Sequence, residues 1–200
     1  MTAQKNPADS ASGADSESIY QKSSAAYYTL GILTLVYSFN FIDRQLLSIL
    51  QEPIKQDLSL SDTQLGLLSG VSFAFFYVIA GIPFGRMADR GNRRNIISWA
   101  LATWSAMTAL CGVAQNYWQL LAARIGVGVG EAGCSPPAHS MISDIFPLER
   151  RATALSIYST GINIGILFGF LLGGWLNEFF GWRVAFVVVG LPGILLAGIV

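Results

Sequence analysis

The chain has 200 residues, of which 52% are hydrophobic and only 12% are charged, and its mean hydropathy is +0.50. Soluble globular proteins carry about 25% charged residues, so this composition indicates a protein in lipid and excludes soluble enzymes and secreted modules. Twelve Lys and Arg residues balance twelve Asp and Glu residues, which leaves no basic surplus for binding nucleic acid. Two Cys and one His offer little for a disulfide framework or a zinc site, and we expect no metal and no cofactor.

The first segment, residues 1–26, is expected to be a disordered tail. It is polar up to Lys22, rich in Ala, Ser and Asp, and has no apolar periodicity. It is not a signal peptide, because no apolar core follows a basic start. The folded domain is therefore predicted to cover residues 27–200.

Long runs without charged residues predict membrane-spanning helices after this tail. Each run reaches or approaches the roughly 20 residues that cross a bilayer core. The run over 95–123 is too long for one helix, and the polar pair Gln115 and Asn116 divides it. The six predicted helices cover residues 27–50, 64–85, 95–113, 117–141, 152–176 and 184–200.

The positions of the basic residues predict the orientation. Eight lie in the tail and in the second and fourth loops, whereas the other loops hold only Lys55 and Arg183. Cytoplasmic loops are enriched in Lys and Arg, so both chain ends are expected in the cytoplasm. The sixth span runs into Val200 without a polar flank, and we expect the chain to be half of a longer protein. The eight basic residues are Lys5, Lys22, Arg86, Arg90, Arg93, Arg94, Arg150 and Arg151.

Four charged residues fall within the predicted spans: Asp43, Arg44, Arg124 and Glu131. An unpaired charge at mid-membrane costs about 2.5 to 3.5 kcal/mol on insertion scales, so these residues must pair or face water. At about 1.5 Å per residue, the first three lie about 10 Å below the outer ends of their predicted helices, and Glu131 about 10 Å deeper. Arg124 and Glu131 share one helix face, and Tyr37 and Asn40 form a polar stripe with Arg44.

Two interpretations of these charges are open. They are either structural ion pairs that hold helices together, or the parts of a binding site for an anion. In the second interpretation Arg44 and Arg124 contact an anionic head group, and Asp43 or Glu131 is an acid that takes up and releases a proton. The candidate substrate-binding residues are Tyr37, Asn40, Arg44, Arg124 and Glu131, and the candidate proton-coupling residues are Asp43 and Glu131.

Glycines at four-residue intervals mark the fifth predicted helix. Gly161, Gly165, Gly169 and Gly173 form a flat face that another helix can approach closely, either as ordinary packing or as a moving interface. We predict no catalytic residues. Cys134, Ser135 and His139 are close in sequence, but two prolines interrupt the helix between them and no third orienting group is evident.

The second loop resembles a motif of the major facilitator superfamily, G-x-x-x-D-R-x-G-R-R. The loop runs from Gly85 to Arg94, with Asn92 where the family has Gly, a change that Asn tolerates because it accepts positive φ. The resemblance implies that this loop latches a cytoplasmic gate against the other half of the protein. The candidate gating residues are Gly85, Asp89, Arg90, Arg93 and Arg94.

More narrowly, several residues resemble the spinster-like branch of that superfamily, whose members move lysolipids and sphingoid phosphates. The fifth helix is similar to the superfamily's antiporter pattern, but Phe170 replaces its proline. The residues that carry the branch resemblance are Asn40, Phe41, Asp43, Arg44, Gly128, Gly130, Glu131, Ala132, Pro136 and Asp144.

The resemblance implies an all-α integral membrane fold of twelve helices, in which this chain is the N-terminal half, built from two inverted three-helix repeats. We therefore predict a secondary active, proton-coupled transporter, not an enzyme, that works by alternating access on an amphiphilic anion such as a lysophospholipid or a sphingosine-1-phosphate-like lipid. The alternatives are a carrier of a small organic or sugar acid anion and a non-transporting lipid-binding membrane module. The expected partners are substrate, protons, membrane lipid and the C-terminal six-helix half, in the bacterial inner (plasma) membrane.

Overall fold

The computed structural model describes residues 7–200, with side chains described from residue 24 onward. Within that range the chain is helical and has no strand, which confirms the all-α prediction. Its elements in order are α1 (Pro7–Leu58), α2 (Asp62–Gly66), the π-helix η1 (Leu67–Val71), α3 (Ser72–Arg90), α4 (Arg93–Cys111), α5 (Tyr117–Ala132), α6 (Ser135–Ile145) and α7 (Leu148–Ala197).

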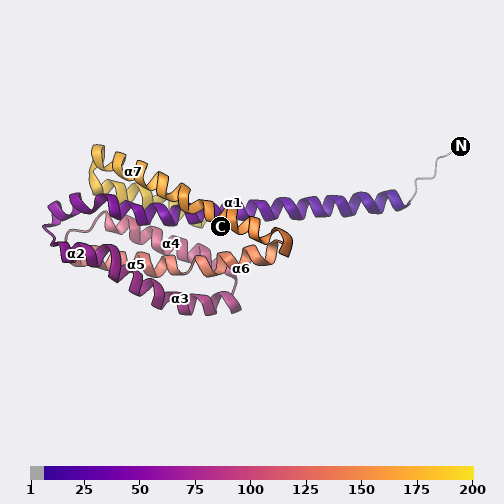
Figure 1. Ribbon diagram of the computed structural model, residues 1–200, viewed down its shortest axis with the longest axis horizontal. Coiled ribbons are helices and arrows are strands. Elements are labelled where there is room, and N and C mark those ends of the chain that lie inside the picture. The colour runs from indigo at the N-terminus through magenta and orange to yellow at the C-terminus, as the bar shows by residue number, and fades with distance from the viewer. Residues whose placement is uncertain (1–6) are drawn as a thin grey trace.

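The first helix is longer at both ends than the predicted 27–50. It begins at Pro7 and so includes residues 7–26, where the sequence predicts a disordered tail, and it projects beyond the other helices (Figure 1). Residues 1–6 of the predicted tail lie outside the described residues. Extending an existing helix adds one hydrogen bond per residue without the cost of a new nucleus, which favours this continuation. At the other end the helix stops where Ser59 turns to a φ of 52°.

The second predicted helix, 64–85, is made by α2, η1 and α3 together. Ser61 begins it with a capping box, in which its hydroxyl accepts from the Gln64 backbone N–H while the Gln64 side chain accepts from the Ser61 backbone N–H. The π-helical segment is a local widening of this rod.

The fourth predicted helix, 117–141, is two helices. α5 ends at Ala132 and α6 begins at Ser135, because Pro136 and Pro137 lack the N–H groups that a continuous helix needs but fit the first turn of a new one. The break places Glu131 in the last turn of α5.

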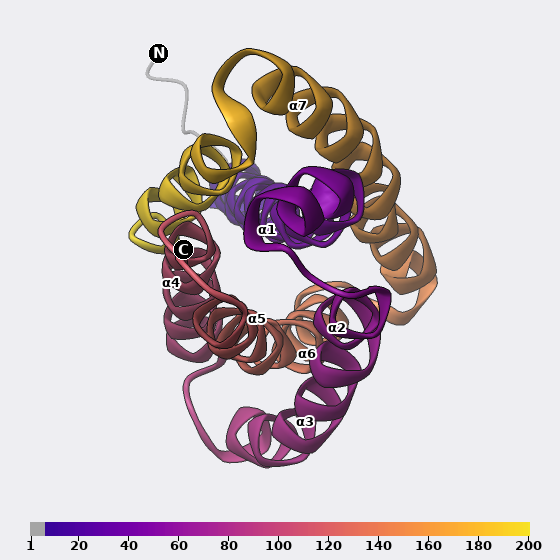
Figure 2. The same cartoon turned by 90° about the vertical axis from the view of Figure 1, so that its left-hand side faces the viewer.

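The fifth and sixth predicted helices are the two arms of α7. Gly181, with φ 82° and ψ 165°, separates them, and the chain folds back on itself there (Figure 2). An L residue with a side chain rarely adopts this conformation, so glycine allows the reversal.

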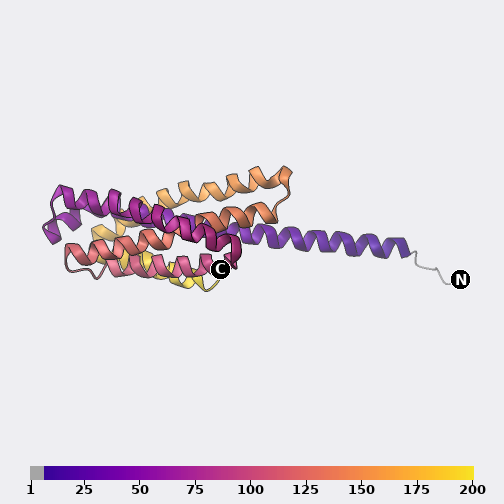
Figure 3. The ribbon, with the colours of Figure 1, turned by 90° about the horizontal axis from the view of Figure 1, so that it is seen from below.

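The helices run side by side along one direction (Figures 1 and 3). α1 packs on α7, and α4 packs on both α5 and α7, while α3 packs on α5. Among the described residues three helical stretches are long and apolar enough to cross a membrane: Ser24–Leu58, Asp62–Arg90 and Leu148–Ala197. The last is folded at Gly181 and supplies two passes, so the protein is an integral membrane protein.

The glycine face of α7 lies against α1. Gly161, Gly165, Gly169 and Gly173 are all buried, and a Cβ added at Gly161 would lie 2.8 Å from the Thr34 carbonyl oxygen. Only a residue without a side chain permits this separation between the two backbones.

Candidate functional site

The structure brings the four intramembrane charged residues into one cluster between α1, α4 and α5. The Nε of Arg44 donates to the Oε2 of Glu131 at 2.8 Å. The hydroxyl of Thr108 donates to the Oδ2 of Asp43 at 3.2 Å. Asp43, Arg124 and Glu131 are buried, whereas the Arg44 side chain keeps 31% of its surface exposed. Arg44 is therefore the charge of the cluster that is most open to the surroundings.

Adjacent residues on α1 reach different helices. One residue step turns an α-helix by about 100°, so Asp43 and Arg44 cannot point the same way. Asp43 faces Thr108 on α4, and Arg44 faces Glu131 on α5.

The predicted offset of about 10 Å between Arg44 and Glu131 is wrong, because α1 continues to Leu58 instead of ending at residue 50. Arg44 lies fourteen residues before Leu58, and Glu131 lies fourteen residues after Tyr117, where α5 begins. Each residue is thus about 21 Å along its own helix from the same end of the bundle. The extra length of α1 is what lets the two side chains meet.

Arg124 is buried, with 2% of its surface exposed, and its Nε and Nη1 have no hydrogen-bond partner among the described residues. Its guanidinium carbon lies 5.3 Å from the centre of the Phe73 ring. A cation–π contact of this kind stabilises the charge by about 0.5 to 2 kcal/mol. The ring does not replace an oxygen acceptor for the N–H groups of the guanidinium. The Arg124 guanidinium is therefore able to donate to an anion.

Aromatic rings also surround the guanidinium of Arg44. Its carbon lies 5.2 Å from the ring centres of Phe41 and Phe73, and 5.1 Å from that of Tyr77. Phe73 thus contacts both arginines. Since rings replace water around these cations, an anion bound here would interact with them at a lower dielectric than in solvent.

Unpaired polar atoms gather around the same cluster. Five side chains of the cluster have a buried polar atom without a hydrogen-bond partner among the described residues. Each such atom costs about 1 to 3 kcal/mol of stability. This concentration of unsatisfied donors and acceptors is typical of a site that binds something. The atoms are Asn40 Oδ1, Asp43 Oδ1, Trp104 Nε1, Arg124 Nε and Nη1, and Glu131 Oε1.

Tyr37, a predicted substrate-binding residue, lies beside this cluster in an aromatic row. Its ring stacks on Tyr158 of α7 at 4.3 Å between ring centres and meets Phe41 edge to face at 5.2 Å. Tyr158 in turn meets His139 of α6 edge to face at 5.2 Å. The row forms an apolar wall that continues from Arg44.

The sequence did not identify four side chains of the site: Phe73, Tyr77, Trp104 and Thr108. They lie in predicted spans without charged residues, where nothing singles them out. The available signal is spacing, because Phe73 and Tyr77, like Trp104 and Thr108, are four residues apart and share a helix face.

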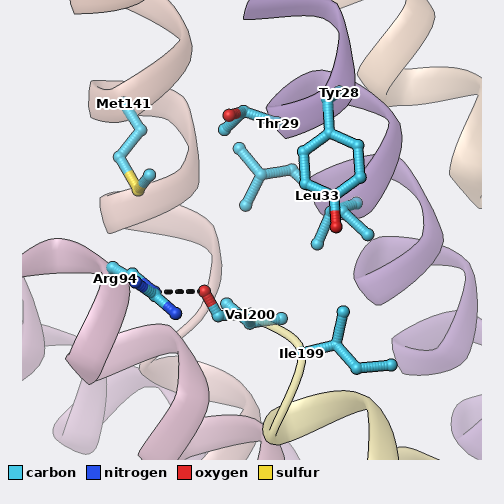
Figure 4. A pocket seen from close by; sticks show the side chains of 8 residues that line it. Tyr28, Thr29, Leu33, Arg94, Met141, Ile199 and Val200 are labelled. Atoms are coloured by element: carbon cyan, nitrogen blue, oxygen red, sulfur yellow. Dashed lines mark hydrogen bonds between the residues drawn. The ribbon is translucent and has the colours of Figure 1, made fainter. Parts of the chain in front are cut away.

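Two of the predicted gating residues make contacts within the chain. Arg93 forms an ion pair with Asp144 of α6, and its Nε donates to the Ala88 carbonyl oxygen at 3.3 Å. The Arg94 Nε donates to the carbonyl oxygen of Val200, at the edge of a pocket of about 290 Å³ between α1, α4 and α6 (Figure 4). These arginines thus join the start of α4 to α6 and to the residues that follow α7.

The other gating residues are free of such contacts. Asp89 and Arg90 are exposed and form no ion pair among the described residues, and a Cβ at Gly85 would meet no atom within 4 Å. The sequence allows for a positive φ at Asn92, but its φ is −76°. Its side chain instead caps α4 by accepting from the backbone N–H groups of Arg94 and Asn95.

At the opposite end of the bundle Arg183 joins three segments. Its guanidinium pairs with Asp57 of α1, donates to the Ala114 carbonyl oxygen at 3.0 Å and lies 4.2 Å from the centre of the Trp182 ring. The Trp182 indole also donates to Asp57, at 3.2 Å. These contacts hold the turn of α7 at Gly181 against α1 and the α4–α5 connection.

Comparison with known proteins places this arrangement among described families. The sequence model of the Major Facilitator Superfamily matches residues 33–200. The chain is similar to a crystal structure described as a bacterial homolog of the human lysosomal transporter Spinster in an inward-facing, unoccupied conformation. The identity is 44% and the TM-score 0.81, over 87% of this chain and 42% of the other.

Three curated relatives differ in what they are named for. An MFS-type efflux pump of Mycolicibacterium smegmatis is 40% identical over 88% of this chain and 41% of its own length. A "Probable galactarate/D-glucarate transporter" of Bacillus subtilis is 34% identical over 88% of this chain and 40% of its own length. A sphingosine-1-phosphate transporter of Danio rerio is 34% identical over 72% of this chain and 29% of its own length. The chain therefore spans about two fifths of the length of the first two relatives and less of the third.

Proposed function

Because the chain belongs to the major facilitator superfamily, a family of transporters rather than enzymes, we propose that it forms the N-terminal half of a secondary active carrier for an amphiphilic anion. In this proposal the C-terminal six-helix half completes the carrier, and the two halves rock around a site near the bilayer midplane. The distribution of basic residues favours a cytoplasmic N-terminus, and we place the carrier in the bacterial inner membrane.

The observation that carries the proposal is the buried Arg124 guanidinium with two unbonded nitrogens, close to the ion pair of Arg44 and Glu131. A phosphate or carboxylate head group accepts hydrogen bonds in the geometry that a guanidinium offers. Arg124 provides fixed donors for such a group, and the more exposed Arg44 provides a second cation.

The aromatic row of Phe41, Tyr37 and Tyr158 supports an amphiphile over a fully polar substrate. The partly exposed rings of Phe41 and Tyr37 offer an apolar surface beside the cationic groups, and the buried Tyr158 ring lies behind Tyr37; this arrangement suits a molecule with an anionic head and an acyl tail. The similarity to the Spinster homologue and to the sphingosine-1-phosphate transporter favours the same class.

A sugar acid anion is the second candidate. The similarity to the galactarate/D-glucarate transporter extends over 183 residues, and the unpaired Oδ1 of Asn40 can accept a hydrogen bond from a hydroxyl group. A hydroxylated carboxylate needs several such polar partners, whereas a lipid head group needs mainly the two arginines.

Proton coupling is assigned in this proposal to Asp43 and Glu131. Both are buried carboxyl groups, and each has one oxygen without a hydrogen-bond partner among the described residues. Protonation of a buried carboxylate removes the cost of its charge. In this proposal Glu131 alternates between its ion pair with Arg44 and a bound proton, and this alternation couples proton movement to transport. The gate is assigned to the exposed Asp89 and Arg90, together with Arg93 and Arg94.

The test is uptake into proteoliposomes that contain the full-length carrier, with a fluorescent lysophospholipid and radiolabelled glucarate compared with and without an imposed pH gradient. We expect uptake of the lysophospholipid in the wild type and its loss in Arg124→Gln. Lys55→Gln is the matched control, because it removes a cation from an exposed ion pair that contributes little. Uptake of glucarate alone would move the assignment to the sugar acid, and binding without uptake of either probe would identify a non-transporting lipid-binding module.

A further inference from the structure

A second polar site lies between α1 and α7, at the end of the bundle where the second and fourth loops gather. It is a pocket of about 250 Å³. The ring of Tyr27 meets Phe146 edge to face at 5.5 Å and forms one side of it. Its lining residues are Tyr27, Phe146, Arg150, Thr153, Ala154 and Ile157.

The polar groups of this pocket are arranged on one side of the first turns of α7. Arg150 and Thr153 are three residues apart on the same helix face, and both are exposed. Among the side chains described, residues 24–200, neither makes a hydrogen bond or an ion pair through its side chain. Arg150 also lies in the first turn of a long helix, whose positive dipole end adds to its charge.

The pocket becomes apolar away from the loops. Ala154 is buried, and Ile157, about 10 Å along the helix from Arg150, is 40% exposed. A cationic and hydroxyl-bearing mouth followed by an apolar wall is the order of groups in a membrane phospholipid, from its phosphate to its acyl chains.

We propose that this pocket binds an anionic phospholipid of the adjacent membrane leaflet. Its phosphate lies on the Arg150 guanidinium and the Thr153 hydroxyl, and the start of one acyl chain lies along Tyr27, Phe146 and Ile157. Charge complementarity at this end of the bundle selects this occupant, because the two loops hold six arginines against three acidic residues and attract an anionic surface. Those residues are Arg86, Arg90, Arg93, Arg94, Arg150 and Arg151, against Asp89, Asp144 and Glu149.

This site is separate from the cluster around Glu131 and does not depend on what the protein transports. On the topology of the proposed function the leaflet is the cytoplasmic one, but occupation of the pocket can be measured without knowing the orientation.

The experiment is photocrosslinking of the full-length carrier in proteoliposomes of phosphatidylcholine that contain a small fraction of a diazirine-tagged lipid, with adducts located by mass spectrometry of peptides. The probes are phosphatidylglycerol and phosphatidylcholine with the same tagged chain. We expect adducts of the phosphatidylglycerol probe on Tyr27, Phe146 or Ile157, and about a fivefold loss of these adducts in Arg150→Gln. Arg86→Gln, which removes the same charge from the same end of the bundle, is expected to retain them.

Equal labelling of the pocket by both probes, or unchanged labelling in Arg150→Gln, would overturn the proposal. If labelling fell as much in Arg86→Gln as in Arg150→Gln, the proposal would also be overturned. Such a result would mean that the lipid is attracted to the basic surface in general and not to a defined site. Arg150 is exposed, so its replacement should leave the fold intact, and size-exclusion chromatography checks this. Thr153→Val provides a second test that leaves the charge unchanged. We expect it to lower the yield of phosphatidylglycerol adducts by less than Arg150→Gln does and to leave the phosphatidylcholine adducts unchanged.

Discussion

Replacement of glycine by alanine along α7 offers a graded test of its packing on α1. A Cβ at Gly169 would lie 2.8 Å from the Cβ of Gln45 and 3.3 Å from the Cα of Ile42. Carbon atoms pack best at about 3.5 to 4.0 Å, so α1 and α7 must move apart in Gly169→Ala. In contrast, a Cβ at Gly174 on the same helix meets no atom within 4 Å.

The two variants share one effect and differ in the other. Each gains the helix propensity of alanine over glycine, about 0.8 to 1.0 kcal/mol in water-soluble hosts. Only Gly169→Ala suffers overpacking, which costs about 1 to 3 kcal/mol. We therefore expect Gly169→Ala to be less stable than Gly174→Ala by about 1 to 3 kcal/mol, since the shared gain cancels in the comparison.

Gly173→Ala should fall between these two variants. Its Cβ would lie 3.1 Å from the Cδ1 atoms of Ile49 and Leu46, which are the ends of flexible side chains and can move aside. The assay is unfolding of the purified full-length carrier in mixed micelles by titration with SDS, followed by tryptophan fluorescence. Equal stability of Gly169→Ala and Gly174→Ala would refute the packing of the glycine face on α1.

Four further predictions concern the site and the turns. Glu131→Gln should abolish the dependence of uptake on a pH gradient while the protein still inserts in the membrane, because the amide cannot exchange a proton. Thr108→Val should lower the free energy of unfolding by about 1.5 to 3 kcal/mol and change the pH profile of uptake, since it removes the hydrogen bond to Asp43. Gly181→Ala should lower the free energy of unfolding by about 1 to 3 kcal/mol, measured by SDS titration, because its φ of 82° and ψ of 165° suit only glycine while its surroundings leave space for a Cβ. Gly165→Leu should reduce uptake per molecule of carrier in the membrane and lower its stability, because the face of α7 there lies on the Ser38 backbone and Phe41 of α1.

Specific results would contradict these expectations. Loss of membrane insertion in Glu131→Gln would favour a purely structural ion pair with Arg44. An unchanged pH profile in Thr108→Val would separate Asp43 from coupling. Wild-type stability of Gly181→Ala would mean that the chain reverses without a strained backbone, and normal uptake by Gly165→Leu would remove the glycine face from any moving interface.

The membrane class is readable from the sequence because it depends on composition over about 20 residues. The absence of charge over long runs, with the polar break at Gln115 and Asn116, is a local property, and so is the four-residue spacing of the glycines in α7. The reversal at Gly181 also agrees with the separation of the fifth and sixth predicted helices. Local chemistry was sufficient for these features, whereas the break before Pro136 divides a helix that the sequence predicted as one.

The partners of the buried charges depended on the tertiary structure. Arg44 meets Glu131 because α1 runs to Leu58, and no local signal sets the length of a helix beyond its apolar run. Asp43, one residue away, bonds to Thr108 on a different helix, so its partner follows from how α4 packs beside α1. Phe73 contacts both arginines from a stretch whose sequence is simply apolar. Hydropathy identifies which residues lie in the membrane, but rotation and packing of whole helices decide which of them meet.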